Sequence, residues 1–207
     1  MSEPSSGTVF VVDDDASVRR SLVRLLKSAG HAVESFASAA EFLQRQPFDE
    51  VGCVVLDVRM PGMDGLALQE HLALRDCPLP IVFISGHGDI PMSVRAMKAG
   101  AVDFITKPFR DETLLGAVDQ SLAKCREERQ RRAEVAAVRE RLATLSPREL
   151  QVLRHVLSGQ TNKQIAASLG TAEKTVKIQR GRVMEKMQAE SLDHLLRMTG
   201  QAGVSPE

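Results

Sequence analysis

Residues 8–15 read TVFVVDDD, an apolar, β-branched run of strand length that ends in three acidic residues. Similar runs of strand length cover residues 53–56, 81–84 and 102–105, and residues 31–36 form a weaker fifth. Between these runs, apolar residues recur at the three- and four-residue spacing of helices. Strands that alternate with helices pair in parallel through crossovers. The pattern therefore predicts a doubly wound α/β domain with five parallel strands and helices on both faces of the sheet.

Length and composition are those of a folded protein with more than one domain. The chain has 207 residues, of which 43% are apolar, so two domains with packed cores are expected. Residues 1–8 show no basic cluster followed by an apolar stretch, and no run approaches the roughly 18 apolar residues of a membrane helix. The three cysteines, Cys53, Cys77 and Cys125, have no metal-like spacing. These features predict a cytoplasmic protein without a membrane partner.

The zero net charge of the chain conceals two oppositely charged halves. Residues 1–122 contain 11 Lys or Arg against 17 Asp or Glu, and residues 123–207 contain 16 against 10. The halves therefore carry about −6 and +6. Such an asymmetry is found by chance or on two solvated surfaces, but it also fits a cation-binding half joined to a polyanion-binding half.

Polar residues follow the predicted strands at the sheet edge where α/β proteins bind ligands. Asp13 and Asp14 follow the first run, Asp57 ends the run at 53–56, Ser85 follows the next, and Lys107 follows the last. Carboxylate oxygens suit Mg²⁺, and a carboxylate can also accept a phosphoryl group. Phosphoryl transfer needs mainly positioning and charge neutralisation, which a metal and a lysine supply.

A purely structural interpretation exists for each feature alone. An acidic triplet before a helix is often only an N-cap, and we favour this role for Asp15. A lone Lys107-Pro108 pair is usually a turn. The acidic pair, Asp57, Ser85 and Lys107 stand at the ends of four different predicted strands, however, and this combination favours a functional site.

These residues stand in motifs that resemble the receiver domain of two-component response regulators. The motifs are residues 11–15, 56–65, 84–89 and 104–109, and the resemblance covers residues 7–122. It implies a flavodoxin-like fold with Asp57 as the phosphoacceptor. It also implies a Mg²⁺ site, whose ligands are Asp13, Asp14, Asp57 and the backbone carbonyl of Arg59, with Asp14 the more direct ligand of the acidic pair.

The resemblance also assigns residues to a switch that responds to phosphorylation. Ser85 matches the hydroxyl residue, Lys107 the lysine that contacts the phosphoryl group, and Phe104 the rotating aromatic of the output face. The family often has Thr and Tyr at the switch positions, so Phe104 lacks the phenol hydrogen bond and any aromatic switch must work by packing. The Lys107–Pro108 peptide bond is expected to be cis.

Residues 123–140 are interpreted as a helical linker. Residues 117–145 contain neither Gly nor Pro and are rich in helix-forming Glu, Arg, Gln and Ala. The alternative is an exposed charged tether. A continuous coiled coil is not expected, because the apolar stripe changes phase and the middle is highly polar.

Residues 141–204 predict an all-α domain of four helices. Ser146 and Glu149 form a capping box with Pro147 at the first helical position. Asn162 is predicted to cap a short helix over residues 163–169. A third helix follows over residues 173–188 and a fourth begins at residue 191, the order of a helix-turn-helix scaffold.

Projected at 100° per residue, the third helix has an apolar side with Val176, Val183 and Met187. Its opposite side is basic and contains Lys174, Ile178 and Gly181, flanked by Lys177 and Arg182. A basic face opposite an apolar seam suits a helix in the major groove. A solvated charged face is common on any surface helix and is the alternative.

The motifs around residues 145–149, 162–166 and 174–177 resemble the LuxR-type helix-turn-helix, so the whole chain resembles a FixJ/NarL-type response regulator. The chain departs from the family at Gln179, where His is frequent, and at Ala172, where a capping Ser is frequent; Thr171 is an alternative cap. The residues expected to contact DNA are Lys163, Lys174, Thr175, Lys177, Ile178, Arg180 and Arg182.

The resemblance implies a phosphorylation-controlled transcription regulator. A sensor histidine kinase would phosphorylate Asp57 with Mg²⁺, which would promote homodimerisation and binding to promoter DNA, with RNA polymerase as a further partner. Two alternatives stay open: a protein-interaction switch that does not bind DNA, and a haloacid-dehalogenase-type phosphatase. The phosphatase would need a second Asp two residues after the nucleophile, where this chain has Arg59.

Overall fold

The structure, a computed structural model, describes residues 7–45, 47–86 and 90–204. The chain divides into two compact units, Met1–Arg129 (unit 1) and Gln130–Glu207 (unit 2). Among the described residues, none of the helices combines the length and apolar character needed to cross a membrane.

Unit 1 is built on a five-stranded parallel sheet in the order β2-β1-β3-β4-β5. Its strands are β1 (Thr8–Val12), β2 (Ala32–Phe36), β3 (Gly52–Asp57), β4 (Ile81–Ser85) and β5 (Asp103–Thr106). The prediction of five parallel strands is confirmed, with every strand boundary within one residue of the expected one.

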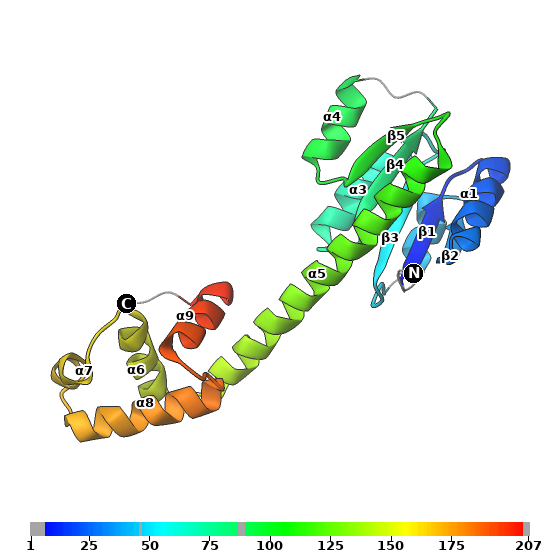
Figure 1. Ribbon diagram of the computed structural model, residues 1–207. Coiled ribbons are helices and arrows are strands. Elements are labelled where there is room, and N and C mark those ends of the chain that lie inside the picture. The colour runs from blue at the N-terminus through cyan, green and yellow to red at the C-terminus, as the bar shows by residue number, and fades with distance from the viewer. Residues whose placement is uncertain (1–6, 46, 87–89, 205–207) are drawn as a thin grey trace. The chain divides into compact units, whose positions relative to one another are not determined.

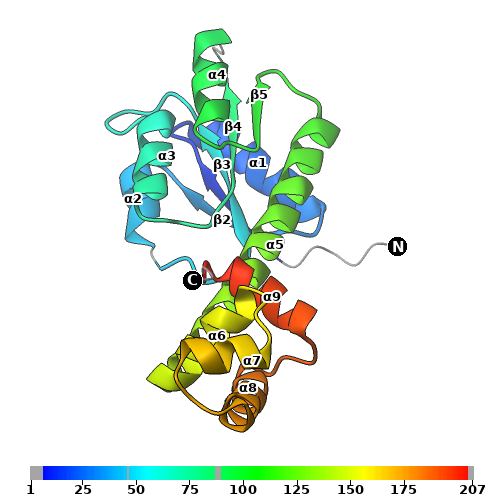
Figure 2. The same cartoon turned by 90° about the vertical axis from the view of Figure 1, so that its left-hand side faces the viewer.

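Helices cover both faces of this sheet, as Figures 1 and 2 show for α1 and α5 on one side and for α2 and α3 on the other. The helices of the chain's first part are α1 (Ala16–Ser28), α2 (Ala39–Gln44), α3 (Gly65–Leu74), α4 (Ile90–Lys98) and α5 (Asp111–Ala143). The doubly wound α/β arrangement is therefore confirmed. Residues 87–89 of the third predicted motif lie outside the described residues.

Each face of the sheet carries its own hydrophobic core. On one face, Phe10 and Phe83 pack with Phe42 of α2. On the other, Leu22 of α1 and Leu122 of α5 pack against the opposite side chains of the same strands. Because β1, β3 and β4 are buried on both faces, their sequences are nearly uninterrupted apolar runs.

The residues of the predicted linker lie in the helix α5, which is 33 residues long. Its last turns belong to unit 2, where Val138 is buried in that unit's core. This segment is therefore a continuous helix and not an extended charged tether.

Unit 2 is helical throughout its described part and contains α6 (Pro147–Leu157), α7 (Asn162–Ser168), α8 (Glu173–Met187) and α9 (Leu192–Gln201) after the end of α5. Its core gathers apolar side chains from all of these helices, including Leu153, Ile165, Val183 and Leu195. Gly170, between α7 and α8, has a φ of +60°, a conformation that favours glycine and permits the tight turn.

Two predicted caps in unit 2 are wrong. The N-cap of α7 is Thr161, not Asn162, because Thr161 Oγ1 accepts from the Gln164 backbone N–H and the Gln164 side chain accepts from the Thr161 backbone. The helix thus begins at Asn162. The N-cap of α8 is Ala172, which offers no side-chain hydrogen bond, so Thr171 does not replace the missing serine.

Candidate functional site

The carboxyl ends of the central strands bring distant polar residues together in unit 1. Asp13 follows β1, Asp57 is the last residue of β3, and Ser85 is the last residue of β4. The parallel register aligns Val12 with Leu56 and Asp57 with Ile84. The side chains that follow therefore meet at one edge of the sheet, as the sequence predicted.

Lys107 joins two of the acids at this edge. Its Nζ lies 3.0 Å from Asp13 Oδ2 and 2.8 Å from Asp57 Oδ1. Asp13 is 1% exposed and Asp57 7% exposed, so both carboxylates are largely removed from water. The peptide bond between Lys107 and Pro108 is cis, as the resemblance implied.

Burial and hydrogen bonding act in opposite directions on the pKa values of Asp13 and Lys107. Burial raises the pKa of Asp13 above its ordinary value, and the hydrogen bond and charge of Lys107 oppose that rise. Burial alone would lower the pKa of Lys107, but its hydrogen bonds to Asp57 and Asp13 raise it overall. Lys107 is consequently held as an ammonium beside Asp57.

Backbone N–H groups hold the remaining carboxylate oxygens in place. Asp13 Oδ1 accepts from the Asp15 backbone at 2.8 Å, and Asp57 Oδ2 accepts from the Arg59 backbone at 2.8 Å. Asp15 itself caps α1, since its Oδ1 accepts from the backbone N–H groups of Ser17 and Val18 at 2.7 and 3.1 Å. The favoured interpretation of Asp15 as a cap is confirmed.

The predicted metal ligands offer only oxygen donors, the type that Mg²⁺ prefers. Asp13 and Asp57 share Lys107, whereas Asp14 is exposed and so is the side chain of Arg59. Within the described ranges, no three His, Cys, Asp or Glu side chains are grouped closely enough to hold a metal ion. The three carboxylates meet two cations at this edge, Lys107 and Arg19, and the Arg19 guanidinium donates to the Asp13 and Asp14 backbone carbonyls at 2.6 and 3.1 Å. One negative charge nevertheless remains in excess. The donor chemistry and the charge therefore fit a hard divalent cation.

The predicted switch residues lie on neighbouring strands. Ser85 is 2% exposed at the end of β4. The ring of Phe104 on β5 is half-buried against Phe83, with 6.0 Å between the ring centroids. The Lys107 backbone N–H donates to the Ser85 carbonyl at 2.8 Å, which connects the ends of the two strands.

In unit 2, α8 has the two faces that the projection predicted. Val176, Val183 and Met187 are buried, and α8 packs against α6 and α7. The predicted DNA contacts that are exposed are Lys163 on α7 and Lys174, Thr175, Lys177, Ile178 and Arg182 on α8. Arg180 differs, because it is half-buried and its guanidinium donates to Asn162 Oδ1 at 3.2 Å.

Comparison with known proteins identifies both units. A family model described as response regulator receiver domain matches residues 9–119, more than half of the chain. A second, described as bacterial regulatory proteins of the luxR family, matches residues 143–199. The chain belongs to the two-component response regulators of the FixJ/NarL type.

Full-length relatives agree with this assignment. Nodulation protein W of Bradyrhizobium diazoefficiens is 53% identical over 95% of this chain and 87% of its own length. The transcriptional regulatory protein FixJ of the same organism is 42% identical over 97% of this chain and 98% of its own. The solved structure of the response regulator StyR matches with a TM-score of 0.83 and 48% identity, covering 95% of this chain and 99% of that one. This response regulator is therefore a two-component transcription regulator with a receiver domain and a LuxR-type DNA-binding domain.

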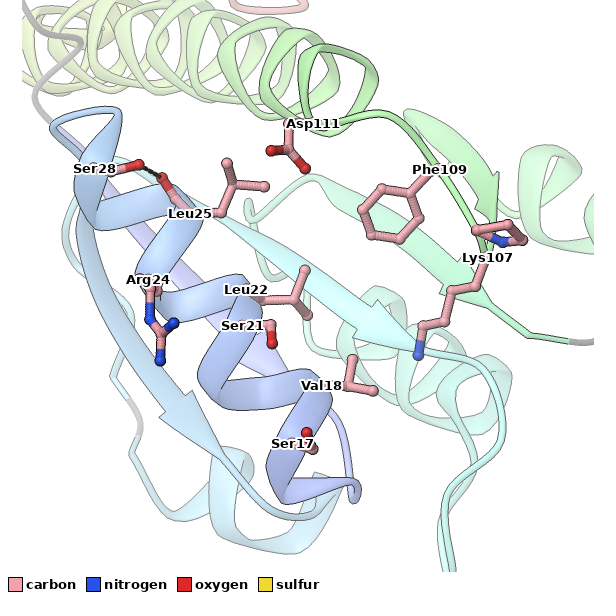
Figure 3. Close-up of a pocket in the computed structure, with 11 residues that line it drawn as sticks. Ser17, Val18, Ser21, Leu22, Arg24, Leu25, Ser28, Lys107, Phe109 and Asp111 are labelled. Atoms are coloured by element: carbon pink, nitrogen blue, oxygen red, sulfur yellow. Dashed lines mark hydrogen bonds between the residues drawn. The ribbon is translucent and has the colours of Figure 1, made fainter.

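The receiver of this response regulator has a cavity that the sequence did not predict. It has a volume of about 670 Å³ and lies between α1 and the segment that leads from β5 into α5, next to Lys107 (Figure 3). Val18, Leu22 and Phe109 give it an apolar floor. Arg24 and Asp111 add charged groups to its lining.

The DNA-binding domain of this response regulator also contains a buried ion pair that was not predicted. Glu149 is 5% exposed, and its Oε2 accepts from Lys186 Nζ at 2.7 Å and from the Ser146 backbone at 2.8 Å. The hydrogen bond from Lys186 is the main cause that lowers the pKa of Glu149 to about 2. The capping box identified Glu149 and Ser146, but no local pattern indicated Lys186, which is 37 residues away.

Proposed function

We propose that Asp57 accepts a phosphoryl group from a cognate sensor histidine kinase, that Mg²⁺ assists the reaction, and that phosphorylation promotes dimerisation and promoter binding. The domains would be a receiver over residues 7–122, a helical linker over 123–140 and a DNA-binding domain over 141–204, working in the cytoplasm. The observation that carries the proposal is Asp57, buried and 2.8 Å from Lys107 Nζ, in a chain that also contains a LuxR-type domain.

The residues around Asp57 suit phosphoryl transfer. A carboxylate oxygen of Asp57 would attack the phosphorus of a phosphohistidine, the P–N bond would break, and the imidazole would leave with a proton from water. Lys107 would neutralise charge on the transferred group, and the Arg59 backbone N–H orients the carboxylate. Asp13, Asp14, Asp57 and the Arg59 carbonyl would hold Mg²⁺, which supplies further positive charge to the phosphoryl oxygens.

The cavity beside Lys107 suits docking of the kinase. An apolar floor next to Lys107 would bury apolar side chains of a partner while its phosphohistidine reaches Asp57. Arg24 and Asp111, which also line the cavity, would orient that partner through charge.

We also propose that the chain does not turn over phosphorylated substrates as a phosphatase. The position two residues after Asp57 is Arg59, whose side chain is exposed and cannot act as a general acid. A turnover assay on small phosphomonoesters tests this, and sustained release of phosphate would contradict it.

The α4 surface is the proposed dimer face. Ile90, Val94 and Met97 are 80%, 44% and 45% exposed, and their spacing of four and three places them along one side of α4. A phosphoryl group on Asp57 would attract Ser85, and Phe104 would move into the space that Ser85 leaves. That movement would change the surface formed by α4 and β5, which a second copy of the chain would then cover.

Phosphorylation should convert the wild-type protein from monomer to dimer, and Val94→Asp should prevent this, because the dimer would bury an unpaired charge. Sedimentation of phosphorylated and unphosphorylated protein, with DNA affinity measured alongside, checks the result. Leu74→Asp is the matched control, because Leu74 is an 88% exposed apolar residue on α3 and should leave dimerisation intact. A monomeric phosphorylated wild type with raised DNA affinity would contradict the dimer step.

Lys177→Ala and Arg182→Ala should each weaken binding to specific and random duplexes alike. Loss of one phosphate contact reduces the slope of log affinity against log salt by about one. Titrations at several salt concentrations measure that slope. Arg197→Ala on α9 is the control for losing an exposed cation of unit 2 outside α8. Wild-type affinity and slope in both α8 variants would show that another surface binds the DNA.

A further inference from the structure

The guanidinium of Arg19 holds the backbone of the acidic pair that follows β1. Its Nη1 donates to the Asp13 carbonyl at 2.6 Å and to the Asp14 carbonyl at 3.1 Å. Arg19 lies in the first turn of α1, so its side chain reaches back to the residues that precede the helix. The helix dipole disfavours a cation close to a helix N-terminus. The helix itself therefore gives no reason for an arginine here, whereas the contact with the two carbonyls does.

The two carbonyls belong to the peptide units on either side of the Asp14 Cα. The first unit joins Asp13 to Asp14, and the second joins Asp14 to Asp15. Because each peptide unit is planar, holding both of them fixes the two backbone torsions of Asp14. The Cα–Cβ bond of Asp14 then has a fixed direction. One guanidinium therefore determines how the Asp14 side chain leaves the backbone.

The residues before and after Asp14 are held by their own carboxylates. Asp13 Oδ1 accepts from the Asp15 backbone N–H at 2.8 Å, and Asp15 Oδ1 caps α1. Asp14 differs from both, because its side chain is exposed. Among the described residues, its carboxylate does not form a metal-binding group with those of Asp13 and Asp57. The Asp14 carboxylate must therefore move to join the other two when a cation binds.

A held backbone restricts that movement to the side-chain torsions of Asp14. We infer that Arg19 is a positioning residue of the proposed Mg²⁺ site, where it prepares the Asp14 carboxylate for the metal by holding both flanking peptide units. The inference rests on the proposed Mg²⁺-assisted phosphorylation of Asp57. Hydrogen bonds that orient the ligands of a metal typically contribute about ten- to hundredfold to its affinity.

Positioning and charge predict opposite effects of removing Arg19. By Coulomb repulsion alone, the loss of a cation beside a cation site would strengthen Mg²⁺ binding. The loss of a positioning residue weakens it. Arg19→Met keeps an unbranched side chain without donors and should bind Mg²⁺ about tenfold more weakly than the wild type. An NMR titration of the isotope-labelled full-length protein with MgCl₂, at constant ionic strength, measures this affinity without any reaction.

Two further variants are matched controls. Arg20→Met removes the exposed neighbouring cation, whose charge also reaches the acidic triplet at Asp15, and should leave Mg²⁺ affinity unchanged or slightly raised. Arg19→Lys keeps the charge and can still donate to a carbonyl, so its loss of affinity should be smaller than that of Arg19→Met. The NMR spectra also show whether each variant is folded.

Labelling of Asp57 by a small acyl phosphate donor separates positioning from general damage to the site. In Arg19→Met, the Mg²⁺ concentration that gives half-maximal labelling should rise about tenfold, in line with the affinity. The labelling rate at saturating Mg²⁺ should equal that of the wild type. A rate that stays low at saturating Mg²⁺ would show that Arg19 supports the fold of the site in general, and would overturn the inference.

The remaining failures are distinguishable. Mg²⁺ affinity of Arg19→Met equal to or above that of the wild type would show that Arg19 does not position Asp14. Equal weakening in Arg20→Met would show that the effect does not depend on the held carbonyls. Either result overturns the inference and leaves the proposed Mg²⁺ site standing. If the wild-type protein itself does not respond to MgCl₂, the proposed Mg²⁺ site fails and the inference fails with it.

Discussion

Asp57→Asn is expected to abolish phosphorylation of this response regulator by a small acyl phosphate donor. The amide lacks the anionic oxygen that would attack phosphorus, and it also removes one of the two charges that hold Lys107 at the site. Intact-protein mass spectrometry measures the gain of one phosphoryl group, and peptide mapping locates it. In the wild type, chelation of Mg²⁺ should prevent labelling, because Lys107 and Arg19 do not together offset the charge of the three carboxylates and the incoming phosphoryl group.

Asp15→Asn is the matched control for this experiment. Asp15 belongs to the same acidic triplet as Asp13 but uses its carboxylate to cap α1. Asparagine is an equally good N-cap, so the helix and the labelling should both persist. Labelling of Asp57→Asn at the wild-type level would disprove the assignment of the phosphoacceptor. Loss of labelling in Asp15→Asn would show that the triplet acts in the chemistry beyond its cap.

The sheet was predictable because its central strands are buried on both faces. In β3, every residue is buried, so the sequence shows a continuous apolar run. The segment of β2 was the weakest prediction for a physical reason. It is an edge strand that pairs only with β1, and Ala32 and Ser35 face water. A strand with fewer buried positions has fewer apolar residues from which to recognise it.

The error at α7 had a local signal that could have prevented it. Thr161 and Asn162 are both good N-cap types, but only Thr161 has Gln or Glu three residues later, at Gln164. Asn162 is followed at that distance by Ile165, which the core requires. The reciprocal hydrogen bonds of Thr161 and Gln164 therefore decide where the helix begins.

Long-range pairings carry no comparable local signal. The sequence placed Asp13, Asp57 and Lys107 at one sheet edge because parallel strands end together, but their hydrogen bonds join residues 50 and 94 positions apart. The cavity beside α1 depends on how α1 packs near the segment after β5, and periodicity within either segment does not reveal it. Topology can thus predict which residues converge, whereas only packing shows which atoms meet.

Lys186→Met is expected to destabilise unit 2 by about 2 kcal/mol, because it leaves the Glu149 carboxylate buried without its cation. Breaking a buried pair costs roughly 3–5 kcal/mol, but the Lys186 side chain is 38% exposed, so water screens part of the interaction. Glu149→Gln should cost less, since its amide can still accept from the Ser146 backbone.

The pH dependence of stability gives the same pair a second signature. The folded-state pKa of Glu149, about 2, is depressed from 4.5, so its contribution is complete above about pH 4.5 and is lost as the pH falls toward 2. The difference in unfolding free energy between wild type and Glu149→Gln should therefore shrink as the pH falls through that window. Glu185→Gln, which removes an exposed carboxylate from α8, should show no such trend.

Hydrogen–deuterium exchange measured by mass spectrometry localises the effect of this pair to unit 2. The chain contains neither Trp nor Tyr, so intrinsic fluorescence offers no convenient alternative. At near-neutral pH, peptides from α6 and α8 of Lys186→Met should exchange about thirtyfold faster than in the wild type, the factor that corresponds to about 2 kcal/mol. Peptides from β1 and β3 serve as the internal reference and should be unchanged. Unaltered exchange in α6 and α8 would show that the Glu149–Lys186 pair contributes no net stability to the DNA-binding domain.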